Sequence, residues 1–192
     1  DLSEEYHREI IGYFKGEYLD GRTPNPCVKC NKQLKFGYLV DEARASGLEF
    51  DYFATGHYAR IGYDEKAKRY LLKKATYLKK DQSYFLVLLS QEQLAQIKFP
   101  LGNYTKEEVR AMAKKVGLAT SEKKESQDFY AGDYNDLLDT LPPQGEIVNR
   151  DGQVLGKHKG ICHYTIGQRK GLGIAYPTPL YVVEIDKKNN KI

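Results

Sequence analysis

The sequence predicts an α/β protein in two parts, a larger part with a parallel sheet and a smaller, mostly β part. A helical pattern over residues 31–45 is closed by Gly47, and the β-prone run 50–55 follows it, which is typical of a parallel α/β sheet. Beyond a charged, polar link at 121–127 the chain changes to short β-prone runs separated by Gly, Pro and Asn-Arg-Asp-Gly turns. We therefore expect one domain over residues 1–122 and a second over 123–192.

Local signals predict each element in turn. Apolar residues at helical spacing predict a helix over 2–19 that ends at Gly21, and Thr105 with Glu108 forms a capping box that opens a helix over 105–116. We expect the apolar face of that last helix to be core. The remaining predictions are a helix at 91–97, a hairpin pairing 58–61 with 70–73, and strands at 145–149, 153–156 and 180–185.

Composition narrows the class of protein. The 192 residues carry a net charge of +4, and they include no apolar run long enough to span a membrane and no signal segment. Three cysteines, an odd number, favour a reducing compartment, so we expect a cytoplasmic protein with no membrane partner. The 16 tyrosines and 30 basic residues suit nucleic acid, although many soluble enzymes have a similar composition.

The stretch 21–32 holds the most reactive side chains. Pro24 and Pro26 predict an extended loop that carries Cys27 and Cys30 to a helix beginning near Asn31 as N-cap. The helix dipole, with Lys29 and Lys32 nearby, predicts a lowered thiol pKa. Cys30 is therefore a candidate nucleophile or metal ligand.

Other roles for the two thiols remain open. Cys162 is the only other cysteine, so an all-cysteine zinc site within one chain is excluded. A mixed zinc site using Cys162, His158 or His163, a redox disulfide, and a reactive thiol or cluster site all fit the pattern.

Three further segments carry candidate binding residues. Gly56 and His57 directly follow the predicted strand, and ligands of open α/β sheets lie beyond the carboxyl ends of strands. Lys80, Asp81 and Gln82 offer a cation, an acid and an amide that suit a phosphodiester and a base edge, or a capped helix start. Glycines frame Arg169 and Lys170 in a basic loop suited to a phosphate backbone, or simply to solvent.

Taken together, these motifs resemble the bacterial tRNA-specific 2-thiouridylases, enzymes that place sulfur on C2 of a wobble uridine. The resemblance runs nearly end to end. The motifs that carry it are Gly21-Arg22-Thr23-Pro24-Asn25-Pro26, Cys30-Asn31-Lys32 with Lys35-Phe36, Ala54-Thr55-Gly56-His57-Tyr58, Lys80-Asp81-Gln82-Ser83-Tyr84-Phe85-Leu86, and the run from Tyr164 to Gly173.

The resemblance implies a fold and a reaction. The fold is the C-terminal part of an adenine-nucleotide α-hydrolase-like (Rossmann-like) domain followed by a small, mostly β, tRNA-contacting domain. ATP with Mg²⁺ adenylates the uridine C2 oxygen, and sulfur from a relay protein or inorganic sulfide replaces AMP. The implied roles are catalysis by Cys30 and Cys27, ATP contact by Gly56, and tRNA contact by Asn25, Pro26, Cys27, His57, Lys80, Asp81, Gln82, Arg169 and Lys170.

The sequence departs from the family pattern in three ways. The phosphate loop Ser-Gly-Gly-x-Asp-Ser is absent, so we expect an internal fragment that binds ATP poorly by itself. Tyr130 stands where the usual second cysteine follows Ser126, and Cys27 occupies a position that is commonly Asp. Two hypotheses follow: a 4Fe-4S cluster on Cys27, Cys30 and Cys162, or a Cys27–Cys30 pair that shares the persulfide and resolving roles.

Two functions of other kinds stay open at this point. One is a tRNA-binding or metal-binding fragment without catalysis of its own. The other is a different adenylating enzyme of the same superfamily, which the cysteine stretch and the Gly-Gln-Arg-Lys-Gly-Leu-Gly run disfavour.

Overall fold

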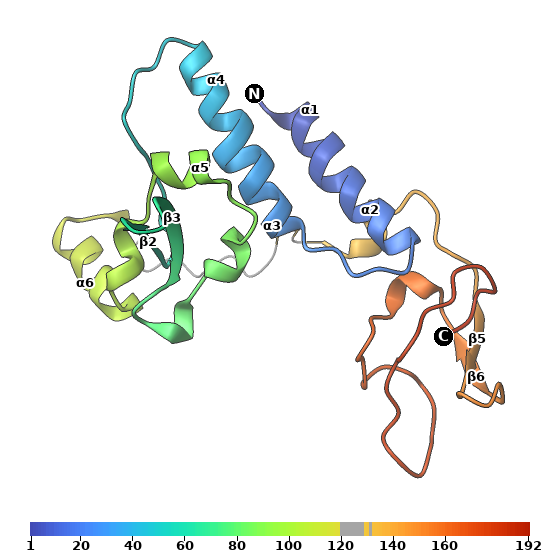
Figure 1. Cartoon of the computed structure of the whole chain (residues 1–192). Coiled ribbons are helices and arrows are strands. Elements are labelled where there is room, and N and C mark those ends of the chain that lie inside the picture. The colour runs from blue at the N-terminus through green and yellow to red at the C-terminus, as the bar shows by residue number, and fades with distance from the viewer. Residues whose placement is uncertain (120–128, 131) are drawn as a thin grey trace. The chain divides into compact units, whose positions relative to one another are not determined.

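A computed structural model describes residues 1–119, 129–130 and 132–192 (Figure 1). The predicted domain boundary at 122/123 and Ser126 of the departing motif lie outside the described residues. The chain divides into two compact units: Asp1–Glu9 with Pro26–Phe129, and Ile10–Asn25 with Tyr130–Ile192. Within the described residues no helix combines the length and the apolar character needed to cross a membrane.

The first unit contains a helix that starts earlier than predicted. It begins at Pro26 as α3 (Pro26–Cys30), continues as the π-helical η2 (Asn31–Tyr38) and ends as α4 (Leu39–Ala45). The predicted extended loop up to Asn31 is therefore wrong. Proline suits the first helical position, because its fixed φ is already helical and its missing N–H would have had no partner there.

The parallel step of the sheet is present but short. β1 (Phe53–Ala54) pairs in parallel with β4 (Ile97–Lys98), so the predicted strand 50–55 is reduced to two residues. The hairpin formed by β2 (Ala59–Asp64) and β3 (Arg69–Lys74) is antiparallel, as predicted. α5 (Gln91–Gln96) and α6 (Lys106–Lys115) both begin with complete capping boxes, at Ser90 and Thr105.

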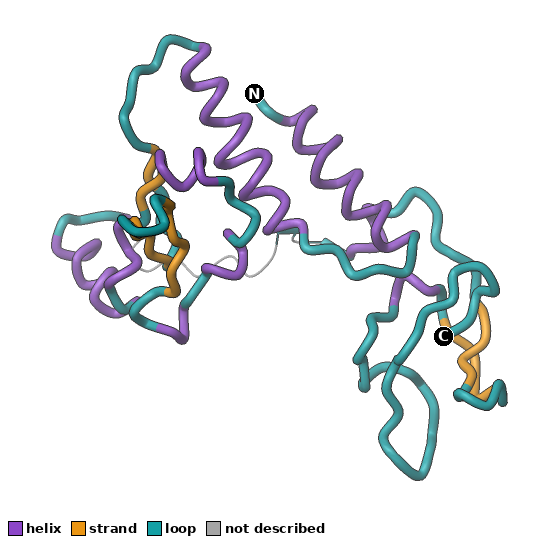
Figure 2. The backbone as a smooth tube through the Cα atoms, in the orientation of Figure 1, coloured by secondary structure: helices purple, strands orange, loops and turns teal. Residues whose placement is uncertain are grey.

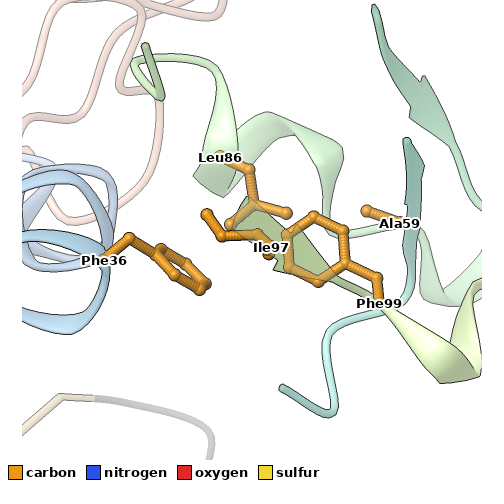
Figure 3. Close-up of a cluster of buried hydrophobic side chains, with 5 residues drawn as sticks. All are labelled: Phe36, Ala59, Leu86, Ile97 and Phe99. Carbon is orange, nitrogen blue, oxygen red and sulfur yellow. The ribbon is translucent and has the colours of Figure 1, made fainter. Parts of the chain in front are cut away.

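The core of the first unit joins these elements. Figure 3 shows Phe36, from the π-helix, facing side chains from β2, from β4 and the residue after it, and from the turn η4 (Ser83–Leu86). The rings of Phe36 and Phe99 meet edge to face with centroids 6.0 Å apart. α6 contributes no buried residue, and its Met112 and Val116 are exposed, so the predicted core face of that helix is wrong among the described residues.

The second unit is built on fewer regular elements. It receives α2 (Gly12–Leu19), the last part of one helical run that starts with α1 (Ser3–Tyr6) and η1 (His7–Ile11). Two of the predicted strands are present, β5 (Gly145–Val148) and β6 (Val154–His158), and they form an antiparallel pair. Loops follow the short turn η8 (Ile161–His163) (Figure 2).

The predicted strand 180–185 is not formed. Its central residue Val182 is buried and exchanges two backbone hydrogen bonds with a turn, donating to Gln168 at 2.9 Å and accepting from Gly167 at 2.7 Å. A turn offers only these two partners, so the run does not become part of a ladder.

Candidate functional site

Cys27 and Cys30 lie one turn apart on α3. Residues three apart share a helix face, and helix geometry sets their Cα atoms roughly 5 Å apart, within the range of a disulfide. Both thiols are half-buried and neither forms a disulfide. The first helical turn thus presents a pair of thiols that can exchange a sulfur atom or oxidise to a bridge.

The predicted lowering of the Cys30 thiol pKa is wrong. Burial raises the pKa of this thiol, Lys35 opposes that shift, and the neighbouring Cys27 adds to it. The expected dipole effect relied on a helix beginning after Cys30, but the helix begins four residues before it. Cys30 therefore sits inside the helix, where desolvation of the thiolate dominates.

Lys35 is placed by the π-helix. In a π-helix the backbone bonds run from i to i+5, so residues five apart lie above one another, and Lys35 is five residues after Cys30. The Lys35 ammonium lowers the pKa of Cys30 and also that of His57. One cation therefore acts on the thiol and on the histidine at the end of β1.

His57 follows β1, as predicted, and is held by three neighbours. Its ring lies 5.8 Å from those of Phe36 and Phe99, and its Nδ1 is 2.8 Å from Thr55 Oγ1. Burial, and then Lys35, lowers the pKa of His57 to about 4. The imidazole is therefore neutral at pH 7 and offers Nε2 as a hydrogen-bonding group rather than a cation. Gly56 beside it is exposed.

The 80–86 segment is tied to the same strand end. Gln82 accepts from Tyr58 N at 2.9 Å through its side chain and donates from its own N to Tyr58 O at 2.8 Å. Asp81 accepts from Ala75 N and from Ser83 Oγ, each at 2.7 Å, and these hydrogen bonds outweigh burial and lower its pKa. Asp81 therefore joins the residue after β3 to the start of η4.

Asn31 connects the cysteine helix to this segment. It is a buried polar residue, and its side-chain N–H donates to Phe85 O at 3.0 Å. The predicted N-cap role for Asn31 is wrong because it lies within the helical run. The hydrogen bond brings Cys30, the end of β1 and the 80–86 segment into one part of the first unit.

Arg169 and Lys170 lie in the second unit on an exposed, glycine-framed loop. Gly167 and Gly171 have φ of +87° and +79°, a region that favours glycine. Gln168 fixes the loop by accepting from Thr165 N at 2.9 Å and donating to Lys170 O at 3.1 Å. Of the other candidates, Pro26 is buried at the first helical position and Asn25 donates its N–H to Tyr13 Oη at 3.3 Å.

Two family models cover most of the chain. One, described as the tRNA methyl transferase HUP domain, matches residues 1–130, and the other, the tRNA methyl transferase PRC-barrel domain, matches residues 136–192. The tRNA-specific 2-thiouridylase MnmA of Endomicrobium trichonymphae is 54% identical over all of this chain and 54% of its own length. The like-named protein of Gloeothece citriformis is 51% identical over all of this chain and 56% of its own length.

This chain belongs to the family that these two models describe, proteins with a tRNA methyl transferase HUP domain and PRC-barrel domain. It is similar over its whole length to proteins named tRNA-specific 2-thiouridylase. The predicted fold class is confirmed, since a HUP (Rossmann-like) domain is followed by a small PRC-barrel domain. The chain spans about half the length of the curated relatives it matches.

Within each unit, the described residues do not bring together the donor groups that the predicted metal sites need. No set of three or more His, Cys, Asp or Glu side chains in the described part of the chain is arranged to hold a metal ion. Cys162 is buried in the second unit. His158 is also buried, with Nε2 bonded to Asn190 O at 3.0 Å and Nδ1 accepting from Gly160 N at 3.1 Å, so neither ring nitrogen remains for zinc.

Sequence reasoning missed three residues of the site. Besides Lys35 and Asn31, the Tyr6 hydroxyl belongs here: burial raises its pKa, and the thiols of Cys30 and Cys27 raise it further, so the phenol lies near both. Lys35 and Asn31 stood inside the family motif, but only the π-helical spacing and the burial reveal what they contact.

Proposed function

We propose that this chain takes part in the 2-thiolation of a tRNA uridine, with Cys30 as the residue that carries sulfur. The observation that supports this most directly is the pair of thiols one helical turn apart, in the same unit as Lys35 and the neutral His57 at the carboxyl end of β1. The relatives bear the name tRNA-specific 2-thiouridylase, and a thiol pair suits sulfur transfer.

ATP is a substrate of the proposed reaction. The uridine C2 oxygen attacks the α-phosphorus, pyrophosphate leaves, and the C2–O bond becomes breakable because AMP is a good leaving group. Gly56 is exposed at the carboxyl end of β1, which is where nucleotides bind in open α/β sheets. We assign the ATP contact to the Gly56 backbone, with Mg²⁺ accompanying the nucleotide.

Sulfur then moves through Cys30. The Cys30 thiolate takes the terminal sulfur of a persulfide donor and releases the donor thiolate, and the new terminal sulfur attacks C2 while the C2–O bond to AMP breaks. Lys35 favours the anionic sulfur because its ammonium opposes the effect of burial on Cys30. We infer a persulfide-carrying relay protein as donor. Inorganic sulfide, the alternative source, would not load Cys30: it would attack the adenylated C2 directly while the C2–O bond to AMP breaks.

Cys27 completes the transfer. Its thiolate attacks Cys30 Sγ, the S–S bond to the product breaks, 2-thiouridine leaves, and a Cys27–Cys30 disulfide remains for a dithiol reductant to reopen. The two cysteines share one helix face, which suits this bridge. Tyr130 cannot hold sulfur, and Cys27 takes the resolving role in its place. We route no step through an iron–sulfur cluster, because the described residues offer no third ligand beside the pair.

The remaining candidates would hold the tRNA. His57 is neutral, so we assign it a hydrogen bond to the RNA rather than an ion pair with phosphate. Lys80, Arg169 and Lys170 are assigned to phosphates. Asp81 and Gln82 already bond to backbone groups, so their contribution is to shape the segment that carries Lys80.

The test is to load the reduced chain with sulfur from a persulfide donor and locate the added sulfur by mass spectrometry. We expect the extra sulfur on Cys30, its loss in Cys30→Ser, and its retention in the control Cys162→Ser. A Cys27→Ser variant should load normally but accumulate a mixed species with the uridine.

Two results separate the alternatives. Sulfur located on Cys162, or equal loading of Cys30→Ser and wild type, contradicts the assignment of Cys30. Binding of tRNA without any sulfur loading instead supports a tRNA-binding module without chemistry of its own.

A further inference from the structure

A basic and aromatic hollow lies beside the β2–β3 hairpin of the first unit. It encloses about 740 Å³, and we call it the hairpin groove. The lining residues that define it are Tyr52, Arg60, Tyr63, Tyr70, Lys73 and Lys98. None of the residues that line it is an aspartate or a glutamate. None of the residues assigned above to catalysis or tRNA contact is among them.

Two of the cations of the hairpin groove face each other across the two strands. Arg60 and Lys73 are register partners across the antiparallel hairpin, and like charges directly opposite each other destabilise a sheet. The Lys73 side chain lies over Gly62, where a Cβ would be only 2.6 Å from Lys73 Nζ. Neither cation forms an ion pair with a carboxylate in the described part of the chain. An anionic ligand would relieve this repulsion.

Tyrosines also line the groove, and one of them lies beside Lys98. Tyr63 and Tyr70 are also register partners, with ring centroids 5.0 Å apart, and Lys98 Nζ lies 4.0 Å from the centroid of the Tyr52 ring. Tyr52 is 52% exposed and Tyr63 46% exposed, so both rings have area left for a ligand. Proteins that bind single-stranded nucleic acid combine cations that contact the phosphate backbone with exposed aromatic rings that stack on bases.

The hairpin groove adjoins the site already described. Phe99, drawn in Figure 3, lines the groove and also contacts the His57 ring at 5.8 Å. Only the Phe99 ring therefore separates the groove from His57, so an RNA bound at His57 lies next to the groove.

We propose that the hairpin groove binds a single-stranded stretch of RNA, with Arg60, Lys73 and Lys98 on phosphates and Tyr52 and Tyr63 stacking on bases. The inference rests on the proposed function in that the RNA is the tRNA substrate, contacted away from the uridine that reacts. An acidic peptide would match the charges, but it would leave the tyrosine faces without a planar partner.

The test compares two triple variants of equal charge in binding a fluorescein-labelled, unmodified tRNA transcript and a labelled uridine oligonucleotide. One variant is Arg60→Gln, Lys73→Gln and Lys98→Gln in the groove. The control is Arg110→Gln, Lys114→Gln and Lys115→Gln, which removes three exposed cations from α6. Fluorescence anisotropy is measured over a range of salt concentrations.

We expect the groove variant to lose about two units of the log–log salt slope, at roughly 0.7 per phosphate contact, and at least about tenfold in affinity for both probes. The α6 control should keep the wild-type slope. Equal slopes and affinities for the two triple variants overturn the proposal.

Stacking has its own pair of variants. Tyr63→Ala should weaken oligonucleotide binding roughly tenfold, while Tyr63→Phe, which keeps the ring, should bind as the wild type does. Tyr52→Ala repeats the test outside the hairpin, so it remains informative if the first variant unfolds the strands. If neither alanine variant loses affinity, the tyrosines do not stack on RNA.

Two further outcomes are decisive. If polyglutamate displaces the uridine oligonucleotide as readily as unlabelled RNA does, the groove binds acidic peptides and the proposal is refuted. If ATP alone displaces the oligonucleotide, the groove is a nucleotide site and the proposal is refuted as well. Sulfur loading of Cys30 does not depend on the groove. If Cys30 is loaded but RNA does not bind in the groove, only this inference is refuted. If RNA binds in the groove but Cys30 is not loaded, only the sulfur-transfer proposal is refuted.

Discussion

His57 should make the first unit lose stability in mild acid. The folded protein holds the pKa of this imidazole at about 4, against an ordinary value of 6.5, because burial and Lys35 disfavour the charged ring. As the pH falls below 6.5, the unfolded chain takes up the proton first. The stability from this group is therefore fully present above pH 6.5 and is lost as the pH falls to about 4.

The size of the effect follows from the two pKa values. A difference of about 2.5 pKa units corresponds to about 3 kcal/mol at 1.36 kcal/mol per unit. The ring is only half-buried, so solvent screening reduces this to about 2 kcal/mol. That is a large share of the stability of a small domain.

The assay has a direct and an indirect part. Proton NMR titration of the four histidines, assigned by single Asn substitutions, should show His57 titrating near pH 4. Urea unfolding followed by signals of the first unit should show wild type losing about 2 kcal/mol more than His57→Asn between pH 7 and pH 4. His7→Asn, which removes an exposed histidine of the same unit, controls for the loss of a histidine as such.

A titration of His57 near 6.5 would refute the reasoning. So would identical pH dependence of unfolding for wild type and His57→Asn. Either result would mean that the ring is open to water and free to pair with phosphate as a cation, which reverses its proposed role at the RNA.

Three other changes test the environment of the thiols and of the hairpin. Lys35→Gln should raise the pKa of the Cys30 thiol further and slow its alkylation by iodoacetamide at neutral pH. Lys32→Gln, which removes an exposed lysine nearby in the sequence, is the control. An unchanged pH–rate profile of alkylation in Lys35→Gln would contradict this prediction. Gln93→Ala should lower the free energy of unfolding, measured by chemical denaturation, by about 2 kcal/mol. The Gln93 amide N–H group donates to two carbonyls of the π-helix, and its oxygen accepts from Ser90 N in the capping box. The control Gln93→Glu keeps the oxygen that accepts from Ser90 N and loses only the two donated hydrogen bonds. Gly102→Ala should cost about 3 kcal/mol in the same assay, because its Cβ would overlap the carbonyl oxygen of the buried Ala59; wild-type stability would show that the hairpin shifts freely.

Much of the fold was readable from local sequence. The Thr105 capping box, the β2–β3 hairpin and the strands β5 and β6 occur within a few residues of their predicted places, because each depends on side chains only a few residues apart. The position of Gly56 and His57 after a parallel strand follows from the same kind of signal.

Tertiary structure decided the chemistry of the thiols. Pro26 was read as part of an extended loop, but it begins a helix whose buried face packs into the unit, so Cys30 is desolvated and its pKa rises instead of falling. The partial burial of His57 depends on Phe36 and Phe99, which are far apart in the sequence. The pKa of a group depends on all the atoms packed around it, because they decide its desolvation and the charges it meets. A sequence motif specifies only its neighbours along the chain.

The sequence by itself determined the Thr105 capping box, the β2–β3 hairpin, the strands β5 and β6 and the set of residues available for sulfur and RNA. Only the folded chain decided that Lys35 acts on both Cys30 and His57, since that depends on a π-helical turn instead of an α-helical one. The same holds for the hairpin groove, whose cations and rings come from segments between residues 52 and 98. Local propensity acts over a few residues, while burial and electrostatics act through space between segments that the sequence keeps apart.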